Sequence, residues 1–360
     1  MISRRSLLAS AATIASISMT LPTTVWSEEP IPVVATFSIL GDMVQRIGGE
    51  HIALTTLVGP DGDAHVYQPT PQDARAVSEA EILFMNGLEF EGWLERLAES
   101  ASFDGKMVVA TTGVTPIAFD EHDEEGHHDD EHGAHDDHGD DHAAKEDHDD
   151  HGDEHAEHDD HGEDHAGHDD HGEDHAGHDH GHDHGAFDPH AWQSLDAAVI
   201  YVDNITAALS VADPDNANEY YANRATYVAE IEALEEEIHE LMDALPEDKR
   251  TFVTSHDAFG YFAAAYDLTF KAPQGLSTES EASAADVASL ITQIREEGIS
   301  AVFVESITDN RLMEQIANET GATIGGTLYS DALSGEDGPA STYLDMMRHN
   351  ATTMSQAIGG

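Results

Sequence analysis

The chain has 360 residues, and its 73 Asp and Glu against 14 Lys and Arg give a formal net charge of -59. A field this negative opposes contacts with phosphates, which excludes non-specific nucleic-acid binding and disfavours anionic membrane surfaces. The sequence has 26 His and no Cys. Disulfides, thiolate zinc sites, cysteine nucleophiles and cysteine-linked lipid anchors are therefore excluded, and any metal must be bound by imidazole and carboxylate groups.

Residues 1–27 have the composition of an export signal. Arg4 and Arg5 precede an uncharged stretch from Ser6 to Trp26, and acidic residues begin at Glu28. The opening Ser-Arg-Arg-Ser-Leu-Leu resembles a twin-arginine signal, and a general secretory signal with paired arginines is the alternative. Either signal predicts export, to a bacterial periplasm.

After the signal, apolar runs of strand length alternate with stretches of helical periodicity. Strands are predicted at Ile31–Ser38, His51–Val58, Ile82–Met85 and Lys106–Ala110, and helices at Ile39–Ile47, Pro71–Ala80 and Glu91–Ala98. This alternation predicts an α/β lobe with a parallel sheet.

A His-rich, acidic tract interrupts this pattern from Asp120 to Gly185. It contains 20 of the 26 His, 29 Asp and Glu and a single Lys, arranged in close variants of the repeat HDDHGEDHAG. With almost no apolar residues it cannot bury a core, so we expect it to be disordered without metal. Imidazole and carboxylate groups at this density form many weak sites for zinc, copper, nickel or cobalt, whereas a merely solvating loop would not need the histidines. The tract predicts metal capture that weakens as pH falls below the pKa of free histidine.

Helical periodicity resumes at Leu195–Leu209 and Asn216–Leu245, and the second stretch places Ile231, Leu234 and Ile238 in one apolar stripe. This long stretch fits either a surface helix or a strut between two lobes, and its position between two α/β segments favours the strut. Further strands are predicted at Thr251–Thr254, Leu268–Lys271, Ala301–Val304 and Thr323–Thr327, with helices at Ala284–Glu297 and Asn310–Thr320. These elements predict a second α/β lobe.

The predicted fold class is therefore α/β, with two lobes that each contain a mainly parallel sheet flanked by helices and are joined by one long helix. The predicted layout is an export signal 1–27, an N-terminal lobe 28–213 containing the disordered loop 120–186, a linking helix 214–245 and a C-terminal lobe 246–360.

Three histidines outside the tract lie in unusual contexts. His65 lies in GDAHVYQPTP, His190 in DPHAW and His256 in TSHDAFGYF. His65 and His256 follow predicted strand ends, where open α/β sheets place ligand sites. Taken singly, each is better explained as an ordinary loop or core histidine than as a ligand.

Together, the three segments resemble the histidine motifs of the metal-binding solute receptors of bacterial ABC importers, the zinc and manganese receptor family. The likeness extends over nearly the whole mature chain, and the acidic His-rich loop is typical of zinc members. The resemblance implies two α/β lobes joined by a long helix, with the metal between the lobes. It also implies a carboxylate ligand in the second lobe, where the segment YSDAL matches the motif. The implied metal ligands are His65, His190, His256 and Asp331.

Two further expectations concern carboxylates near these ligands. Asp63 and Asp257 adjoin His65 and His256 in the sequence and are predicted to accept hydrogen bonds from imidazole N–H groups. Glu279, Glu281 and Glu305 are interpreted as ordinary solvated side chains.

The resemblance implies Zn2+ as the bound metal. Manganese members tend to have a carboxylate where this chain has His256, and three imidazoles with one carboxylate suit zinc better than manganese. The predicted function is high-affinity capture of Zn2+ in the periplasm and delivery to an ABC permease in the inner membrane, with the tract gathering or buffering zinc. A manganese or iron receptor of the same family is the alternative.

Other partners and protein classes are compatible with parts of the sequence. We expect a monomer that binds no nucleic acid, and a periplasmic metal chaperone is a further candidate partner. A periplasmic zinc buffer or chaperone that acts without a permease would fit the same residues. A metallohydrolase is disfavoured, because no HExxH helix or general base accompanies the ligands, so the chain is not predicted to be an enzyme.

Overall fold

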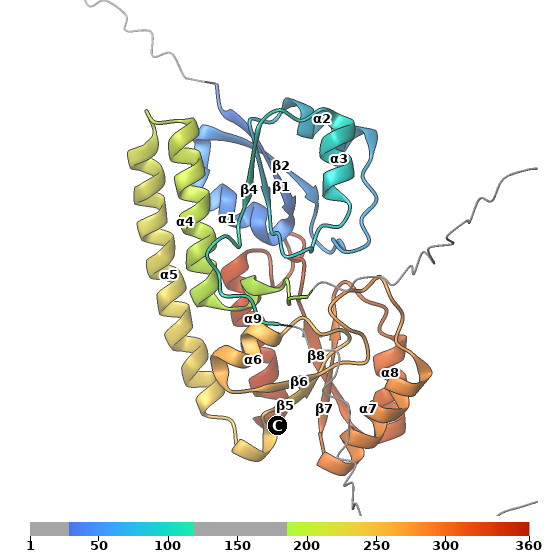
Figure 1. Ribbon diagram of the computed structural model, residues 1–360. Helices are drawn as coiled ribbons and strands as arrows, with labels where there is room; N and C mark the ends of the chain where they lie inside the picture. The colour runs from blue at the N-terminus through green and yellow to red at the C-terminus, as the bar shows by residue number, and fades with distance from the viewer. Residues whose placement is uncertain (1–28, 119–185, 360) are drawn as a thin grey trace, which may run out of the picture. The chain divides into compact units, whose positions relative to one another are not determined.

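The computed structural model describes residues 29–118 and 186–359 (Figure 1). The predicted export signal and the whole His-rich tract, residues 120–185, lie outside these residues. The predictions made for those two segments therefore stay predictions.

The N-terminal lobe is built on a parallel sheet with the strand order β2-β1-β3-β4. Its strands are β1 (Ile31–Phe37), β2 (Ile52–Val58), β3 (Ile82–Met85) and β4 (Lys106–Val109). The flanking helices are α1 (Ser38–Gly48), η1 (Gly49–His51), α2 (Pro71–Glu79), α3 (Leu94–Ala101), η2 (Ala191–Gln193) and α4 (Leu195–Ala212). The β-branched run in β1 is buried from Val33 onward, as expected for a central parallel strand covered on both faces.

The C-terminal lobe repeats this arrangement, with a parallel sheet in the order β6-β5-β7-β8. Its strands are β5 (Thr251–Val253), β6 (Thr269–Lys271), β7 (Ala301–Glu305) and β8 (Thr323–Leu328). The helices are η3 (Glu247–Lys249), α6 (Gly260–Tyr266), α7 (Ala284–Glu297), α8 (Arg311–Thr320) and α9 (Tyr343–Gly359). In both lobes the strand that comes first in the chain is central and the second lies at an edge.

The long helix α5 (Ala217–Asp243) packs against both lobes (Figure 1). It contacts α1 and α4 on the N-terminal side and α6 and α9 on the C-terminal side. Its buried face consists of Tyr220, Tyr227, Ile231, Leu234, Ile238 and Met242. These residues belong to one hydrophobic core that continues from Phe37 to Phe303. Because the lobes share this core, wide hinge opening would break packed contacts, and small movements are expected instead.

The predicted fold class is confirmed, and the differences from the sequence prediction are local. Helix α3 begins at Leu94 rather than at Glu91, because the Glu91 carboxylate turns inward and accepts a hydrogen bond from the Asn86 N–H. The helices α6 and α9 were not predicted. Seven residues of α6 are too few to display a helical period, and α9 has polar residues through much of its length.

Helix α4 is the helix in the described part of the chain that is long and apolar enough to cross a membrane by length and composition alone. Its apolar side chains are used in the core, where Leu195, Tyr201, Ile205 and Leu209 are buried. Its composition is therefore explained by packing within the lobe.

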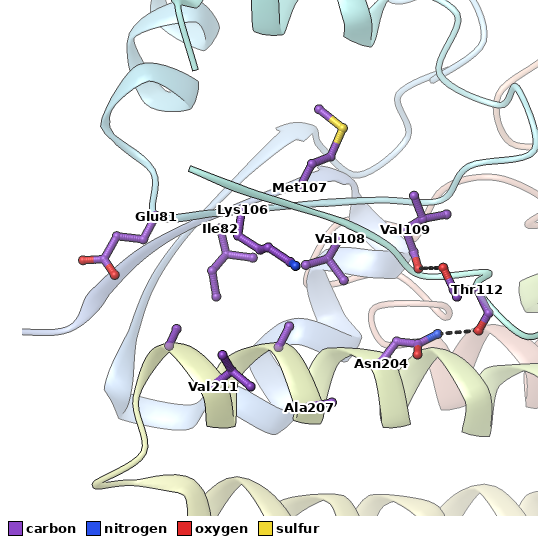
Figure 2. Close-up of a pocket in the computed structure, with 12 residues that line it drawn as sticks. Glu81, Ile82, Lys106, Met107, Val108, Val109, Thr112, Asn204, Ala207 and Val211 are labelled. Atoms are coloured by element: carbon purple, nitrogen blue, oxygen red, sulfur yellow. Dashed lines mark hydrogen bonds between the residues drawn. The ribbon is translucent and has the colours of Figure 1, made fainter. Parts of the chain in front are cut away.

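A groove of about 580 Å³ lies between α4 and β4 (Figure 2). Its lining is mainly apolar and includes Met107, Val109 and Val211. None of the four predicted metal ligands lines it. The groove is therefore separate from the site described below.

Candidate metal centre

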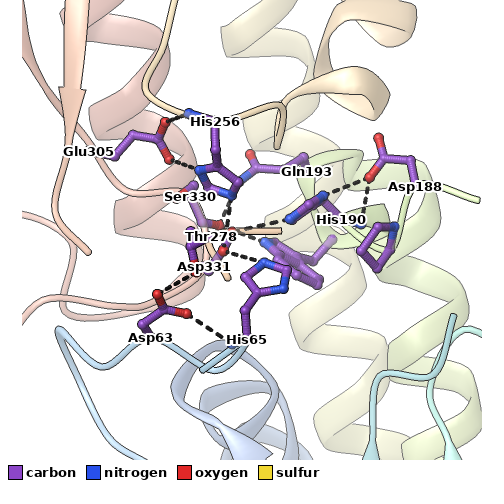
Figure 3. A network of polar contacts seen from close by, with 12 residues as sticks. Asp63, His65, Asp188, His190, Gln193, His256, Thr278, Glu305, Ser330 and Asp331 are labelled. Carbon is purple, nitrogen blue, oxygen red and sulfur yellow. Dashed lines mark hydrogen bonds and ion pairs between the residues drawn. The ribbon is translucent and has the colours of Figure 1, made fainter. Parts of the chain in front are cut away.

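The four predicted ligands meet where the two lobes face one another (Figure 3). His256 follows β5 and Asp331 follows β8, so both lie at the carboxyl edge of the C-terminal sheet. His65 lies in the loop between β2 and α2, and His190 immediately precedes η2. One ligand atom from each of the four residues lies within 4.8 Å of the others. Segments far apart in the sequence are thus brought to one point.

The Asp331 carboxylate is the centre of this cluster. Its Oδ2 lies 3.1 Å from His65 Nε2 and 3.2 Å from His256 Nε2, and its Oδ1 lies 3.6 Å from His190 Nε2. A tetrahedral ion with bonds of about 2.0–2.1 Å holds its donor atoms about 3.3 Å apart. The spacing of the donors therefore fits a small divalent cation placed among them.

The facing atoms also lack other partners. The three Nε2 atoms and both Asp331 oxygens are buried and make no hydrogen bond of suitable geometry with the described residues. A buried polar atom without a partner is costly, by about 1–3 kcal/mol and more when it is charged. Because one ligand atom of each residue lies within 4.8 Å of the others, a single cation among them would satisfy all four residues.

His190 is oriented by the carboxylate of Asp188. Asp188 Oδ1 accepts from the His190 backbone N–H at 2.9 Å and lies 2.7 Å from His190 Nδ1. Since a carboxylate only accepts, Nδ1 carries the proton and the Nε2 lone pair faces Asp331. Gly260 leaves room for this carboxylate, because a Cβ there would lie 2.4 Å from Asp188 Oδ2.

The turn that carries His190 is fixed by two further polar side chains. Asn86 Nδ2 donates to the Pro189 carbonyl at 2.8 Å, and the Tyr261 hydroxyl donates to the Asp188 carbonyl at 3.2 Å. Tyr201 in turn donates to Asn86 Oδ1. These residues were not predicted from the sequence, although Asn86 follows directly after β3 and is a polar residue at a strand end.

His256 is oriented by Glu305, the last residue of β7. Glu305 Oε1 accepts from the backbone N–H groups of Ser255 and His256 at 2.8 and 2.9 Å, and Oε2 lies 2.7 Å from His256 Nδ1. The Glu305 side chain is fully buried. The interpretation of Glu305 as a solvated side chain was therefore wrong, because its strand-end position turns it into the site rather than toward water.

Asp331 is held through the residue before it. The Ser330 carbonyl accepts from both Trp192 Nε1 and Gln193 Nε2 at 2.8 Å. Trp192 and Gln193 belong to η2, next to His190. The same short segment therefore positions one histidine and the carboxylate that faces it.

His65 is the one candidate ligand whose side chain is not completely buried, with 5% of its surface exposed against 0% for Asp331. Its ring packs edge-on against Phe90 at 4.8 Å between centroids. Asp63 Oδ1 accepts from the His65 backbone N–H at 2.9 Å. His65 thus lies at the rim of the cluster.

The expectation that Asp63 and Asp257 accept from imidazole N–H groups was wrong. Asp63 accepts from a backbone N–H of His65, and the Asp257 N–H itself donates to the Gly275 carbonyl. The carboxylates that contact the imidazole Nδ1 atoms are those of Asp188 and Glu305. Proximity in sequence does not decide which carboxylate contacts an imidazole, because Asp188 is 2 positions from His190 whereas Glu305 is 49 positions from His256.

Charge is distributed unevenly among the four side chains. Burial lowers the pKa of His256, but the carboxylates of Glu305 and Asp331 outweigh burial and raise that pKa well above its usual value. Burial raises the pKa of Asp331, but the imidazoles of His256 and His190 outweigh it and hold the pKa well below its usual value. Burial lowers the pKa of His65. In the metal-free protein these shifts favour a protonated His256, whose ring lies between the Glu305 and Asp331 carboxylates.

The described residues contain one other grouping of this kind, formed by Glu50, His51 and Glu219. His51 Nε2 lies 3.0 Å from Glu219 Oε2. Both glutamates are exposed, and exposed acidic groups form such pairs without a metal. The buried four-residue cluster is therefore the candidate metal centre.

Known proteins of similar sequence and structure are named as metal-binding proteins. Residues 33–357 match the family described as ZnuA, zinc-uptake complex component A, periplasmic. The iron-binding protein YfeA of Yersinia pestis is 30% identical over 327 residues, which cover 91% of this chain and 86% of that protein. The Mn-bound periplasmic metal-binding protein of Candidatus Liberibacter asiaticus has 28% identity and a TM-score of 0.68, over 91% of this chain and 98% of that one.

The fold is also that of the periplasmic zinc-binding protein TroA of Treponema pallidum, with a TM-score of 0.71, 24% identity and coverage of 92% of this chain and 99% of that one. The names of these relatives specify iron, manganese or zinc. The metal that this chain binds therefore depends on its own ligands. The predictions of an exported protein and of a binding protein rather than an enzyme are confirmed. The chain belongs to the ZnuA family of periplasmic metal-binding receptors of ABC importers.

Proposed function

We propose that the chain captures Zn2+ at His65, His190, His256 and Asp331 and delivers it to an ABC permease. The observation that carries this proposal is the buried set of three imidazole Nε2 atoms and one carboxylate that face one another without hydrogen-bond partners. Imidazole nitrogen suits zinc, whereas manganese is usually bound by oxygen-rich ligand sets. The two carboxylates behind His190 and His256 support the proposal, because metal-bound histidines commonly donate their other N–H to a carboxylate.

A manganese or iron receptor remains the second candidate. It is favoured by the names of relatives, which include a manganese-binding lipoprotein and an iron-binding protein. Three nitrogen donors would also suit ferrous iron. We place zinc first because the donor set of this chain contains a single carboxylate.

We also propose the domain division 28–213, 214–245 and 246–360 for the exported chain, with the His-rich tract as an insertion in the first lobe. On this division the linking helix includes all of α5. The tract would bind zinc weakly at many places and raise its concentration near the four-ligand site. A periplasmic chaperone or buffer role without a permease would use the same two parts.

The first test measures metal choice by competition calorimetry on the full chain. We expect Zn2+ to bind the tight site in preference to Mn2+ at one ion per chain. His256→Ala should weaken tight zinc binding by at least about 100-fold, because one of four ligands is lost, and Glu305→Gln by about 10–100-fold, because the imidazole loses its orienting carboxylate. Glu279→Gln, which changes an exposed carboxylate, is the matched control. Unchanged zinc affinity in His256→Ala would show that the tight site lies elsewhere.

The second test concerns protons. Because the His256 pKa is raised, zinc must displace a proton from that ring at neutral pH, and its apparent affinity should fall about ten-fold for each unit of pH below the raised pKa. In the metal-free protein the same proton contributes stability that is fully present below the ordinary histidine pKa of about 6.5 and is lost as pH rises through the raised value. Calorimetry of the first zinc equivalent in buffers of different ionisation enthalpy should give about one proton released at pH 7. Zinc binding without proton release would contradict this charge distribution.

The third test removes the tract. Ala118 and Phe187 are paired in an antiparallel bridge, so the chain ends left by deleting residues 120–185 are already adjacent and a short Gly-Ser linker can join them. We expect the variant to keep one tight zinc site and to lose the weak ones, measured as stoichiometry by equilibrium dialysis. Loss of the tight site in the deletion variant would show that the tract supplies its ligands.

A further inference from the structure

The loop that carries His65 is tied across to the other lobe by a side-chain hydrogen bond beside the candidate metal centre. The Thr278 hydroxyl donates to Asp63 Oδ2 at 2.6 Å (Figure 3). The other oxygen of the same carboxylate accepts from the His65 backbone N–H at 2.9 Å. Asp63 therefore links a residue of the C-terminal lobe to the backbone of a candidate ligand in the N-terminal lobe.

Thr278 lies in a segment that is itself tied to another candidate ligand. This segment, residues 272–283 between β6 and α7, pairs with His256 through a parallel bridge at Gln274. The Asp257 N–H donates to the Gly275 carbonyl, and Leu276 is buried. One end of the segment is thus fixed beside His256, and Thr278 extends from it to the loop of His65.

The position of His65 makes this contact important for metal exit. The side chains of His190, His256 and Asp331 are completely buried, whereas 5% of the His65 side chain is exposed. An ion that leaves the cluster must break its bond to the ligand nearest the solvent, and that bond breaks most easily when the loop of His65 moves outward. The hydrogen bond of Thr278 opposes this movement.

Two backbone anchors of the His65 loop lie to either side of Asp63. The Asp61 N–H donates to the Leu333 carbonyl at 2.8 Å, and Trp93 Nε1 donates to the Ala64 carbonyl at 2.7 Å. The first bond holds the loop backbone to the C-terminal lobe and the second holds it to the N-terminal lobe. Neither bond involves Thr278. Removing the Thr278 hydroxyl should therefore release Asp63 from the C-terminal lobe without releasing the whole loop.

We propose that Asp63 and Thr278 act as a latch between the lobes that positions His65 and sets the rate at which the metal leaves the site. The proposal rests on the proposed function of the four-residue cluster. The latch residues do not touch the metal. They act through the His65 backbone, and opening of the latch precedes release of the ion.

The test measures zinc release from the full chain loaded with one equivalent of Zn2+. The protein is mixed with excess 4-(2-pyridylazo)resorcinol, and the slow phase of zinc transfer is followed by absorbance at chelator concentrations where the rate no longer depends on chelator. Thr278→Val removes the hydroxyl and keeps the shape of the side chain. We expect it to release zinc roughly ten-fold faster or more, the effect of losing one hydrogen bond to a charged group. Thr278→Ser, which restores a hydroxyl, should return the slow rate.

Two further variants distinguish the latch from general loosening of the segment and from a wrongly placed metal site. Ser277→Ala removes only the hydroxyl that accepts from the Glu279 N–H within the same segment, so its release rate should stay that of the unaltered chain. The thermal midpoint of the metal-free protein, measured for every variant, reports structural loosening. A Thr278→Val variant with an unaltered release rate, or one matched by Ser277→Ala, would overturn the latch. His256→Ala should lack the slow phase altogether, and a slow phase that persists there would instead overturn the proposed function and the latch with it.

Discussion

A buried carboxylate that faces three imidazoles is the interaction on which the arrangement of this molecule depends. The Asp331 side chain is fully buried, and no described side chain completes its hydrogen bonding. A buried charge costs several kcal/mol unless it is paired. The protein can meet this requirement with a proton on His256 or with a divalent cation, and the two compete for the same imidazole lone pair. Capture and release of a metal follow from this competition.

The surrounding contacts hold the four side chains in place although the atoms that face one another lack hydrogen-bond partners. Asp188 and Glu305 fix the rings of His190 and His256, and the Ser330 carbonyl is held by Trp192 and Gln193. These groups come from both lobes. The continuous core beneath α5 keeps the two sheet edges facing one another. The loop of His65 is the part of the site that the proposed latch would release.

The sequence predicted the fold class because alternating periodicities are local signals that marked the two sheets. The segments around His65, His190, His256 and Asp331 indicated metal ligands only when taken together, through their resemblance to one receptor family. The supporting contacts depend on pairings between distant residues and were not predictable in this way. Glu305 reaches His256 only because β7 lies beside β5, and Asp188 keeps its place only because position 260 is glycine. Thr278 and Asp63 are 215 positions apart. Short helices such as α6 escaped prediction because seven residues cannot show a period.

The central claim is that the lobe-facing cluster, rather than the His-rich tract, is the tight metal site. Anomalous diffraction at the zinc edge, from crystals of the full chain with one equivalent of Zn2+, tests it most directly. The account predicts one strong peak within about 2.0–2.2 Å of the Nε2 atoms of His65, His190 and His256 and of the Asp331 carboxylate. A strong peak elsewhere, with no anomalous density among these four side chains, would contradict it.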